Sequence, residues 1–249
     1  MALHSFSRTE LLIGKEGLDK LSKKRVAIFG IGGVGTFVTE GLARSGVEKF
    51  VLVDHDDICP TNINRQIHAL RSTIGKAKVE VMKDRIIDIN PRAQVITHKV
   101  MYTSETAQEL LDNSYDYVVD AIDMVSAKLD LIERCYKGNI PIISSMGAGN
   151  KLDPTKFEVV DIFDTSICPL AKVVRKELRK RGVEKLKVVY SREAPIKPIE
   201  TKSDSKGDCI STNGEIRSIS RRQTPGSIAF VPSVGGLIIA SEVVRDLIK

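Results

Sequence analysis

The sequence predicts an α/β fold in which helices cover both faces of a doubly wound, mostly parallel sheet. Between about residues 25 and 160, short apolar segments of strand length alternate with amphipathic segments of helix length. The first apolar segment, 26–29, leads directly into a glycine turn, Gly30-Ile31-Gly32-Gly33-Val34-Gly35. Alternation of this kind is typical of parallel strands joined by helical crossovers. Because 249 residues with 42% hydrophobic content can bury a sizeable core, we expect a single domain over residues 1–249.

Periodicity predicts the order of elements in the first part of the chain. The expected order is a helix near 9–21, a strand at 26–29, a helix from about residue 34, a strand at 50–53, an irregular crossover at 62–71, a helix at 76–89, and strands at 95–100, 117–121 and 140–144. Within 76–89, we expect Val79, Met82, Ile86 and Ile87 to face the core, and Asn90-Pro91 to end the helix.

The C-terminal half predicts a basic helix and a flexible loop inserted into the fold. The basic helix covers about 172–180, with Val173, Val174 and Leu178 facing the protein. Residues 193–224 are polar and rich in turn-forming residues, which predicts a mobile loop, and a strand at 227–231 and a helix at 234–248 follow. The chain is thus expected to comprise a core over about 1–165, the helix and mobile insertion over 166–226, and a closing strand and helix over 227–249.

The glycine turn and the next strand predict a nucleotide site. A turn at the carboxyl end of a parallel strand directs the N–H groups and positive dipole end of the following helix toward phosphate. The glycines let the backbone approach the ligand, and they are Gly30, Gly32, Gly33 and Gly35. Asp54 ends the second strand about 20 residues later, where a carboxylate accepts hydrogen bonds from ribose hydroxyls. Taken alone, this Rossmann-like pattern is typical of NAD, so an NAD-binding oxidoreductase or a nucleotide-sensing module is one interpretation.

The residues after Asp54 favour a triphosphate. They are polar or cationic, namely Asp56, Asn62, Asn64, Arg65, Gln66 and Lys78. Backbone N–H groups suffice for a dinucleotide pyrophosphate, whereas a triphosphate attacked at its α-phosphate carries charge that Arg and Lys would neutralise. A later strand ends in two carboxylates, Asp120 and Asp123, and we expect one of them to hold Mg²⁺.

These motifs, in this order, resemble the adenylation domain of ubiquitin-activating-type enzymes over roughly residues 5–165. The resemblance implies that ATP is bound by the glycine turn and Asp54, and that the polar segment contacts its phosphates. It implies catalytic roles for Arg65, Lys78 and Asp123, with Asp123 associated with Mg²⁺. It also implies a homodimer in which Arg8 enters the active site of the partner subunit.

Within that superfamily, the second half resembles the threonylcarbamoyladenosine dehydratases that act on tRNA. The segments that carry this resemblance are 144–150, 161–165, 168–175, 188–191 and 226–233. It implies ATP-dependent cyclisation, with loss of water, of threonylcarbamoyladenosine at position 37 of tRNA through an acyl-adenylate. The nearer alternative is an adenylyltransferase for the C-terminus of a ubiquitin-like sulfur-carrier protein. Those enzymes usually carry two Cys-x-x-Cys zinc pairs, and none is formed by Cys59, Cys135, Cys168 and Cys209.

Positive charge is concentrated in one part of the chain. The formal net charge is +6, and residues 172–192 contain nine Lys or Arg against two Glu, a net +7 that leaves −1 for the remainder. A stripe on the predicted basic helix suits an RNA phosphate backbone, and its residues are Lys172, Arg175, Lys176, Arg179 and Lys180. The alternative for such a run is a solvated surface helix.

The remaining features concern location and unassigned side chains. The N-terminus lacks a charged-then-apolar leader and the apolar run 234–240 is too short to cross a bilayer, so we expect a cytoplasmic protein without membrane contact. His55 and His68 are expected to be structural or at the surface. The sequence assigns no role to Cys168 or Cys209, and it leaves open whether a sulfur-transfer partner protein takes part.

Overall fold

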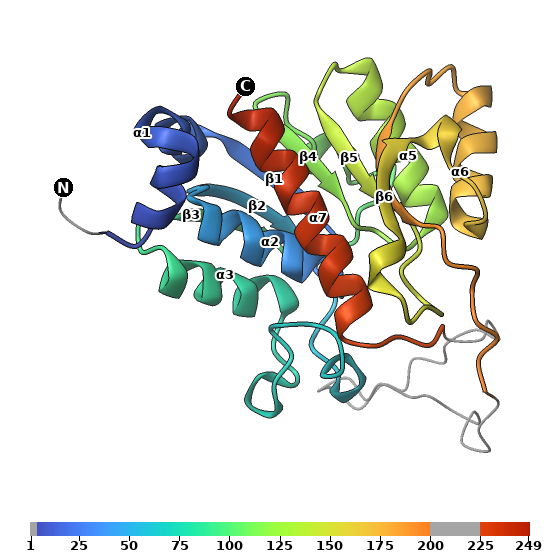
Figure 1. Ribbon diagram of the computed structural model, residues 1–249, viewed down its shortest axis with the longest axis horizontal. Helices are drawn as coiled ribbons and strands as arrows, with labels where there is room; N and C mark the ends of the chain where they lie inside the picture. The colour runs from blue at the N-terminus through green and yellow to red at the C-terminus, as the bar shows by residue number, and fades with distance from the viewer. Residues whose placement is uncertain (1–3, 200–224) are drawn as a thin grey trace.

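A seven-stranded sheet forms the centre of the molecule (Figure 1). This computed structural model describes residues 4–199 and 225–249. The strands are β1 Arg25–Phe29, β2 Lys49–Val53, β3 Gln94–His98, β4 Tyr117–Asp120, β5 Ile142–Ser145, β6 Phe157–Asp161 and β7 Lys187–Ser191. Their order is β3-β2-β1-β4-β5-β7-β6, and only the β6–β7 pair is antiparallel. The predicted doubly wound, mostly parallel sheet is confirmed.

Helices cover both faces of the sheet (Figure 1). One face carries α1 Ser7–Lys23, α2 Gly35–Ser45, α3 Lys78–Ile89 and α7 Phe230–Leu247, and the other carries α4 Ala107–Leu110, α5 Val125–Lys137 and α6 Pro169–Lys180. Short 3₁₀ turns lie at Pro60–Asn62, Arg71–Thr73, Pro154–Lys156 and Ile162–Asp164. None of the helices in the described ranges is long and apolar enough to cross a membrane.

Alternate side chains of the central strand β1 enter different hydrophobic clusters. Val26 and Ile28 pack with α2, α3 and α7, whereas Ala27 and Phe29 pack with α4 and α5. All four are fully buried. Successive strand side chains point to opposite faces, and here both faces are covered, so β1 reads as a continuous apolar run. A third cluster joins α6 to β7 through Val174, Leu178, Val188 and Tyr190.

The predicted strand at 227–231 is wrong. Residues 225–228 are irregular, and α7 begins at Phe230 instead of near residue 234. Pro232 lies in the first turn of α7, where its missing N–H costs no intrahelical hydrogen bond and its fixed φ suits a helix. A short apolar run cannot be told from the start of a buried helix by its pattern alone.

Two side chains predicted to face the core are exposed. Ile87 is 39% exposed and Val173 is 46% exposed, whereas their neighbours Ile86 and Val174 are fully buried. Consecutive residues in a helix point about 100° apart, so only one of each apolar pair reaches the sheet. The predicted mobile loop over 193–224 lies outside the described residues from position 200 onward, and 193–199 form no helix or strand.

Candidate nucleotide-binding site

A cavity of about 510 Å³ opens at the carboxyl ends of β1, β2, β4 and β5. It includes the crevice between β1 and β4, where the winding of the sheet reverses and where open α/β sheets bind ligands. The volume is within the range of small-molecule sites. Its walls contain most of the residues predicted from the sequence, namely Gly30, Gly32, Gly33, Asp54, Asp56, Asn62, Arg65, Gln66, Lys78 and Asp123. The glycine turn and the polar segment are therefore brought together around one space.

The glycine turn packs against the end of β4. Gly30 has φ +92°, and a β-carbon at this position would lie 2.6 Å from the carbonyl oxygen of Ala121, so both the conformation and the space require glycine. A β-carbon at Gly35 would lie 1.8 Å from the carbonyl oxygen of Gly30. Gly35 does not line the cavity, and its role is the close packing that allows α2 to begin beneath the turn.

Asp54 fixes the glycine turn to the end of β2. Its Oδ2 accepts a hydrogen bond from the N–H of Ile31 at 2.6 Å, and its Oδ1 accepts one from the N–H of Asp56 at 2.9 Å. An ionised carboxylate has about four acceptor positions, so capacity remains for ribose hydroxyls. The same residue can therefore shape the turn and bind the sugar.

Two cationic side chains, Arg65 and Lys78, line this cavity. Arg65 donates from Nη1 to the carbonyl oxygen of Thr61 at 2.8 Å and to Oδ1 of Asn64 at 2.9 Å. Burial lowers the pKa of the Arg65 guanidinium, which nevertheless stays charged near neutral pH because its ordinary value is so high. Lys78 is 5% exposed, and its Nζ lies 2.7 Å from Oδ2 of Asp56. This positive charge suits a polyphosphate.

The polar side chains of the crossover segment have different surroundings. Asn62 lines the cavity, and its Oδ1 accepts a hydrogen bond from the N–H of Cys59 at 3.0 Å. Asn64 was predicted to bind nucleotide, but it is exposed, does not line the cavity, and donates from Nδ2 to the carbonyl oxygen of Ser227 at 2.9 Å. Asn64 therefore holds the Arg65 side chain in place through its hydrogen bonds to Arg65 and Ser227. The buried Oε1 of Gln66 has no hydrogen-bond partner in the described ranges, which suits a ligand that donates a hydrogen bond.

The two carboxylates at the end of β4 are not equivalent. Asp120 is fully buried, and its Oδ2 lies 2.6 Å from Nζ of Lys128 and 2.5 Å from Oγ of Ser144. Asp123 is exposed at the cavity and has no hydrogen-bond or ion-pair partner in the part of the chain that the structure describes. Of these two carboxylates, Asp123 is therefore the one available to a cation. Asp54, His55 and Asp56 also bring ligand atoms within 4.8 Å of one another, although the first and third already accept the bonds described above.

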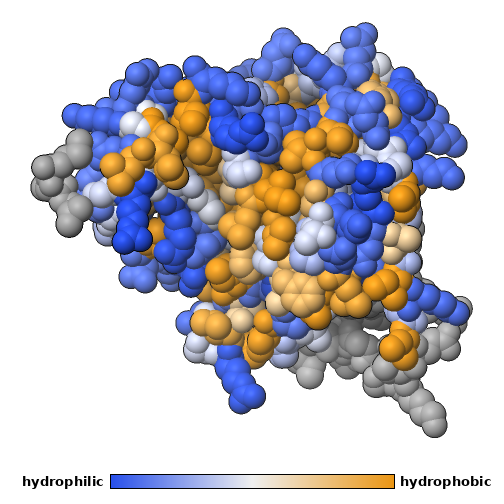
Figure 2. Space-filling model, viewed as in Figure 1, coloured by the Kyte–Doolittle hydropathy of each residue, from blue (hydrophilic) through white to orange (hydrophobic). Residues whose placement is uncertain are grey.

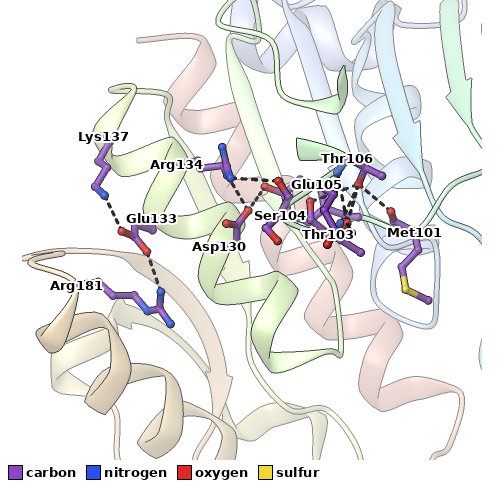
Figure 3. A network of polar contacts seen from close by, with 11 residues as sticks. Met101, Thr103, Ser104, Glu105, Thr106, Asp130, Glu133, Arg134, Lys137 and Arg181 are labelled. Atoms are coloured by element: carbon purple, nitrogen blue, oxygen red, sulfur yellow. Dashed lines mark hydrogen bonds and ion pairs between the residues drawn. The ribbon is translucent and has the colours of Figure 1, made fainter. Parts of the chain in front are cut away.

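The sequence missed several residues that shape the site. Lys128 lies on α5 and reads as an ordinary helix lysine, although it is fully buried. Met101 and Met124 line the cavity after β3 and β4, at positions without a recognisable motif. Figure 3 shows how α5 holds the segment after β3: Arg134 donates to Asp130 at 2.8 Å and to the carbonyl oxygen of Ser104 at 3.3 Å. Thr106 in turn donates to the carbonyl oxygen of Met101 at 3.0 Å.

His68 is structural, as predicted. It is 1% exposed, and its Nε2 lies 3.1 Å from the carbonyl oxygen of Ile31 in the glycine turn. Burial lowers its pKa to about 4, so the imidazole is neutral at physiological pH and Nε2 is the donor.

The predicted RNA-binding residues lie on α6. Four of them are exposed, namely Lys172, Lys176, Arg179 and Lys180. Arg175 is half-buried, and its Nη1 donates to both the carbonyl oxygen and Oγ1 of Thr165, so it secures the preceding turn. Glu133 accepts hydrogen bonds from Lys137 and Arg181 at 2.7 and 2.9 Å and joins the end of this region to α5 (Figure 3). Arg8 is exposed on α1 and does not line the cavity.

Comparison with known proteins identifies the family. The model of the ThiF family matches residues 6–249. This chain belongs to the ThiF family. It is 51% identical over 248 residues to the tRNA threonylcarbamoyladenosine dehydratase of Bacillus subtilis, covering 99% of this chain and 96% of the relative.

Solved structures and a more distant relative extend this comparison within the ThiF family. A structure of the Escherichia coli tRNA N6-threonylcarbamoyladenosine dehydratase, TcdA, in complex with ATP has a TM-score of 0.84 at 32% identity, covering 98% of this chain and 93% of that one. A structure of TcdA with AMP aligns equally well. An adenylyltransferase and sulfurtransferase, MOCS3, of Aedes aegypti is 33% identical over 56% of this chain and 32% of its own length.

Proposed function

We propose that this ThiF-family chain is a tRNA threonylcarbamoyladenosine dehydratase that consumes ATP. The observation that carries the proposal is the cavity beside the glycine turn that holds Asp54, Arg65 and Lys78 together, in a chain that is 51% identical over nearly its whole length to an enzyme of that name. In this proposal Asp54 accepts hydrogen bonds from the ribose, Arg65 and Lys78 bind the phosphates, and Gln66 accepts a hydrogen bond from the ligand. A dehydrogenase would leave these last three side chains without a ligand.

The proposed reaction begins with adenylation of the substrate. The carboxylate of threonylcarbamoyladenosine attacks the α-phosphorus of ATP, forming a C–O–P bond and releasing pyrophosphate. A free carboxylate is a poor electrophile because oxide would have to leave, whereas the acyl-adenylate has AMP as its leaving group. Arg65 and Lys78 stabilise the negative charge that builds up as the α-phosphorus becomes five-coordinate.

Ring closure then completes the dehydration. A carbamoyl nitrogen of the same side chain attacks the activated carbonyl carbon, forms a five-membered ring and expels AMP. The nitrogen loses one proton, and the carboxylate oxygen departs with AMP, so the net change is loss of water. Because both reacting groups are on one nucleoside, the effective concentration is high, and no protein nucleophile is needed.

We propose Asp123 as the side chain that holds Mg²⁺. Of the two carboxylates after β4, it is the one exposed at the cavity, whereas Asp120 is occupied by Lys128 and Ser144. A hard cation prefers carboxylate, phosphate and water oxygens, so the donor set fits. When bound, the ion would neutralise and orient phosphate oxygens.

We propose that tRNA binds along the exposed face of α6. The helix begins at Pro169, next to the cavity-lining residue Leu170, and carries four exposed cations away from it. RNA phosphates could therefore lie along α6 while the modified nucleotide reaches the cavity. A tRNA substrate would place the reaction in the cytoplasm.

We propose a homodimer with Arg8 acting in the partner subunit. Leu11 and Leu12 of α1 are 85% and 88% exposed, and Figure 2 shows apolar surface on α1 and along α7. Exposed apolar patches of this kind mark protein interfaces. Arg8, one turn from Leu11, does not line the cavity of its own subunit, which agrees with a catalytic role in a second subunit.

The function is tested by measuring AMP release with purified protein and ATP. tRNA that carries threonylcarbamoyladenosine is compared with the same tRNA lacking it. We expect AMP only with the modified tRNA, and about a 10²- to 10³-fold lower rate in Arg65→Ala, the loss typical of a removed oxyanion-stabilising group. Ile63→Ala, at an exposed neighbour of Arg65, is the matched control and should keep wild-type activity.

The second candidate is adenylation of a ubiquitin-like sulfur carrier, which the partial similarity to MOCS3 favours. It predicts exchange of pyrophosphate into ATP only when a small carrier protein is present. Sulfur transfer through a protein thiol would need an accessible cysteine. Cys135 and Cys168 are buried, and burial raises the pKa of Cys135 to about 12, whereas Cys209 lies outside the described residues.

A further inference from the structure

A strained turn precedes the basic helix α6. Ile167 has φ +60°, and the N–H of Cys168 donates to the carbonyl oxygen of Ser166 at 2.5 Å, which closes a tight turn around it. A β-branched residue rarely adopts positive φ because its side chain collides with its own backbone. Despite this cost, Ile167 is 58% exposed, so packing inside the protein does not explain its side chain.

The residues on both sides of Ile167 hold this turn in place. Thr165 accepts hydrogen bonds from Arg175 and donates from Oγ1 to the carbonyl oxygen of Ile162 at 2.6 Å. Cys168 is 3% exposed within the cluster beneath α6. Surroundings that determine a strained residue on both sides are typical of functional positions.

The turn lies between the nucleotide cavity and the exposed cations of α6. A β-carbon at Gly147, in the cavity wall, would lie 3.9 Å from Cβ of Leu170 and 4.0 Å from Sγ of Cys168. Ile167 is adjacent to Cys168 in the chain, and Lys172 follows one turn into α6. An RNA strand that ran from the α6 cations to the cavity would therefore pass Ile167.

We propose that Ile167 is an RNA-contacting residue that packs against a base beside the modified nucleotide and so directs that nucleotide into the cavity. This inference rests on the proposed function. Unpaired RNA bases present flat apolar faces, and proteins commonly meet nucleic acid bases with apolar or aromatic side chains. The chain has no Trp and few other aromatic residues, so an exposed aliphatic side chain at this place is the group available for such a contact.

The positive φ of Ile167 allows its side chain to be removed without destabilising the turn. Ile167→Gly removes the apolar side chain and at the same time suits positive φ, so we expect a melting temperature no lower than that of the wild type. With modified tRNA we expect KM for tRNA to rise about tenfold, the loss expected when part of an isoleucine side chain is no longer buried. KM for ATP should not change. Ile167→Leu keeps an apolar side chain without the β-branch and should retain most of the affinity for tRNA.

Ile96→Thr is the control, since Ile96 is 49% exposed on β3 at the opposite edge of the sheet. It should leave KM for tRNA unchanged. The inference is overturned if Ile167→Gly has the wild-type KM for tRNA, if Ile167→Leu fails as badly as Ile167→Gly, or if Ile167→Gly changes the oligomeric state and so places a second copy of the chain on this turn. Wild-type protein that is inactive with modified tRNA would instead contradict the proposed function.

Discussion

At the scale of single residues, the buried ion pair of Lys128 and Asp120 holds together the strand ends that form one side of the nucleotide cavity. Asp120 also accepts a hydrogen bond from the N–H of Ile122 at 3.1 Å, and Lys128 donates to the carbonyl oxygen of Ser145 at 3.0 Å. The pair thus joins the ends of β4 and β5 and leads into the segment that presents Asp123. It is fully buried, so its partners depend on each other.

Removing one partner of this pair should be strongly destabilising. Lys128→Met leaves the Asp120 carboxylate buried without a cation, and we expect the free energy of unfolding to fall by roughly 3–5 kcal/mol. Urea unfolding of the variant and the wild type measures this difference in the free energy of unfolding. Lys137→Met breaks an ion pair whose lysine is 67% exposed and should cost about 0–1 kcal/mol. Adding Asp120→Asn to Lys128→Met should recover part of the loss. Equal, small effects of the two lysine variants would contradict the structural role.

His68 gives the stability a predictable dependence on pH. Burial, with help from the nearby cations Lys78 and Arg85, lowers its pKa from 6.5 to about 4, against the opposing effect of the Ile31 carbonyl. The unfolded chain therefore binds a proton between pH 6.5 and 4 that the folded chain does not, so stability is lost as the pH falls through this window. The contribution is roughly 2–3 kcal/mol.

The measurement is unfolding by urea at pH 7.5 and pH 4.5 for the wild type and for His68→Gln, which keeps a donor for Ile31. We expect the variant to lose less stability on acidification than the wild type. An identical loss in both proteins would assign the acid sensitivity to other groups.

At the scale of elements, α6 is the part of the fold that the RNA proposal depends on. Replacing Lys172 and Lys176 together by Gln removes two exposed cations and should weaken tRNA binding in a salt-dependent way. We expect the slope of log Kd against log salt concentration to fall by up to about 2, because each phosphate contact contributes close to one unit. Binding titrations at several salt concentrations measure this slope.

The paired control replaces Lys23 on α1 and Lys83 on α3 by Gln, which changes the net charge equally on the other face of the sheet. This control should leave the slope near the wild-type value. Equal changes in both double variants would mean that net charge, and not the α6 surface, governs binding.

The elements were predictable where local pattern and tertiary burial agree. The strands and the glycine turn are encoded locally, because β1 is buried on both faces and Gly30 needs positive φ. The start of α7 was not predictable, because an apolar run such as the one from residue 227 onward suits both a strand and a buried helix. The contact of Arg175 with Thr165 was not predictable either, because it depends on a turn ten residues earlier that the helical spacing does not reveal.

The sequence predicted which residues lie at the site, but it did not predict what each of them contacts. Ten predicted residues line one cavity, yet Asn64 and Gly35 serve it from outside. The sequence favours Asp123 over Asp120 only through the resemblance, because it does not reveal that Lys128 lies against Asp120. Such pairs join residues on separate elements, and single-sequence periodicity contains no information about them.

At the scale of the whole molecule, the proposed dimer makes a complementation experiment possible. Arg8→Ala and Arg65→Ala should each be inactive alone. If Arg8 acts in the partner subunit, mixed dimers contain one site with both arginines, and an equal mixture should regain up to about a quarter of wild-type activity. No recovery after exchange of subunits, shown independently by two affinity tags, would place both residues in one subunit's site or remove Arg8 from catalysis.

The dehydratase activity is tested most directly by following the substrate nucleoside. tRNA carrying threonylcarbamoyladenosine is incubated with the protein, with and without ATP, and its nucleosides are then analysed by mass spectrometry under conditions that preserve the cyclic form. If the chain is an ATP-dependent dehydratase, the modified nucleoside becomes lighter by one water only with ATP, and one AMP is formed for each nucleoside converted. An unchanged nucleoside mass in the presence of ATP and active, folded protein would contradict the dehydratase activity.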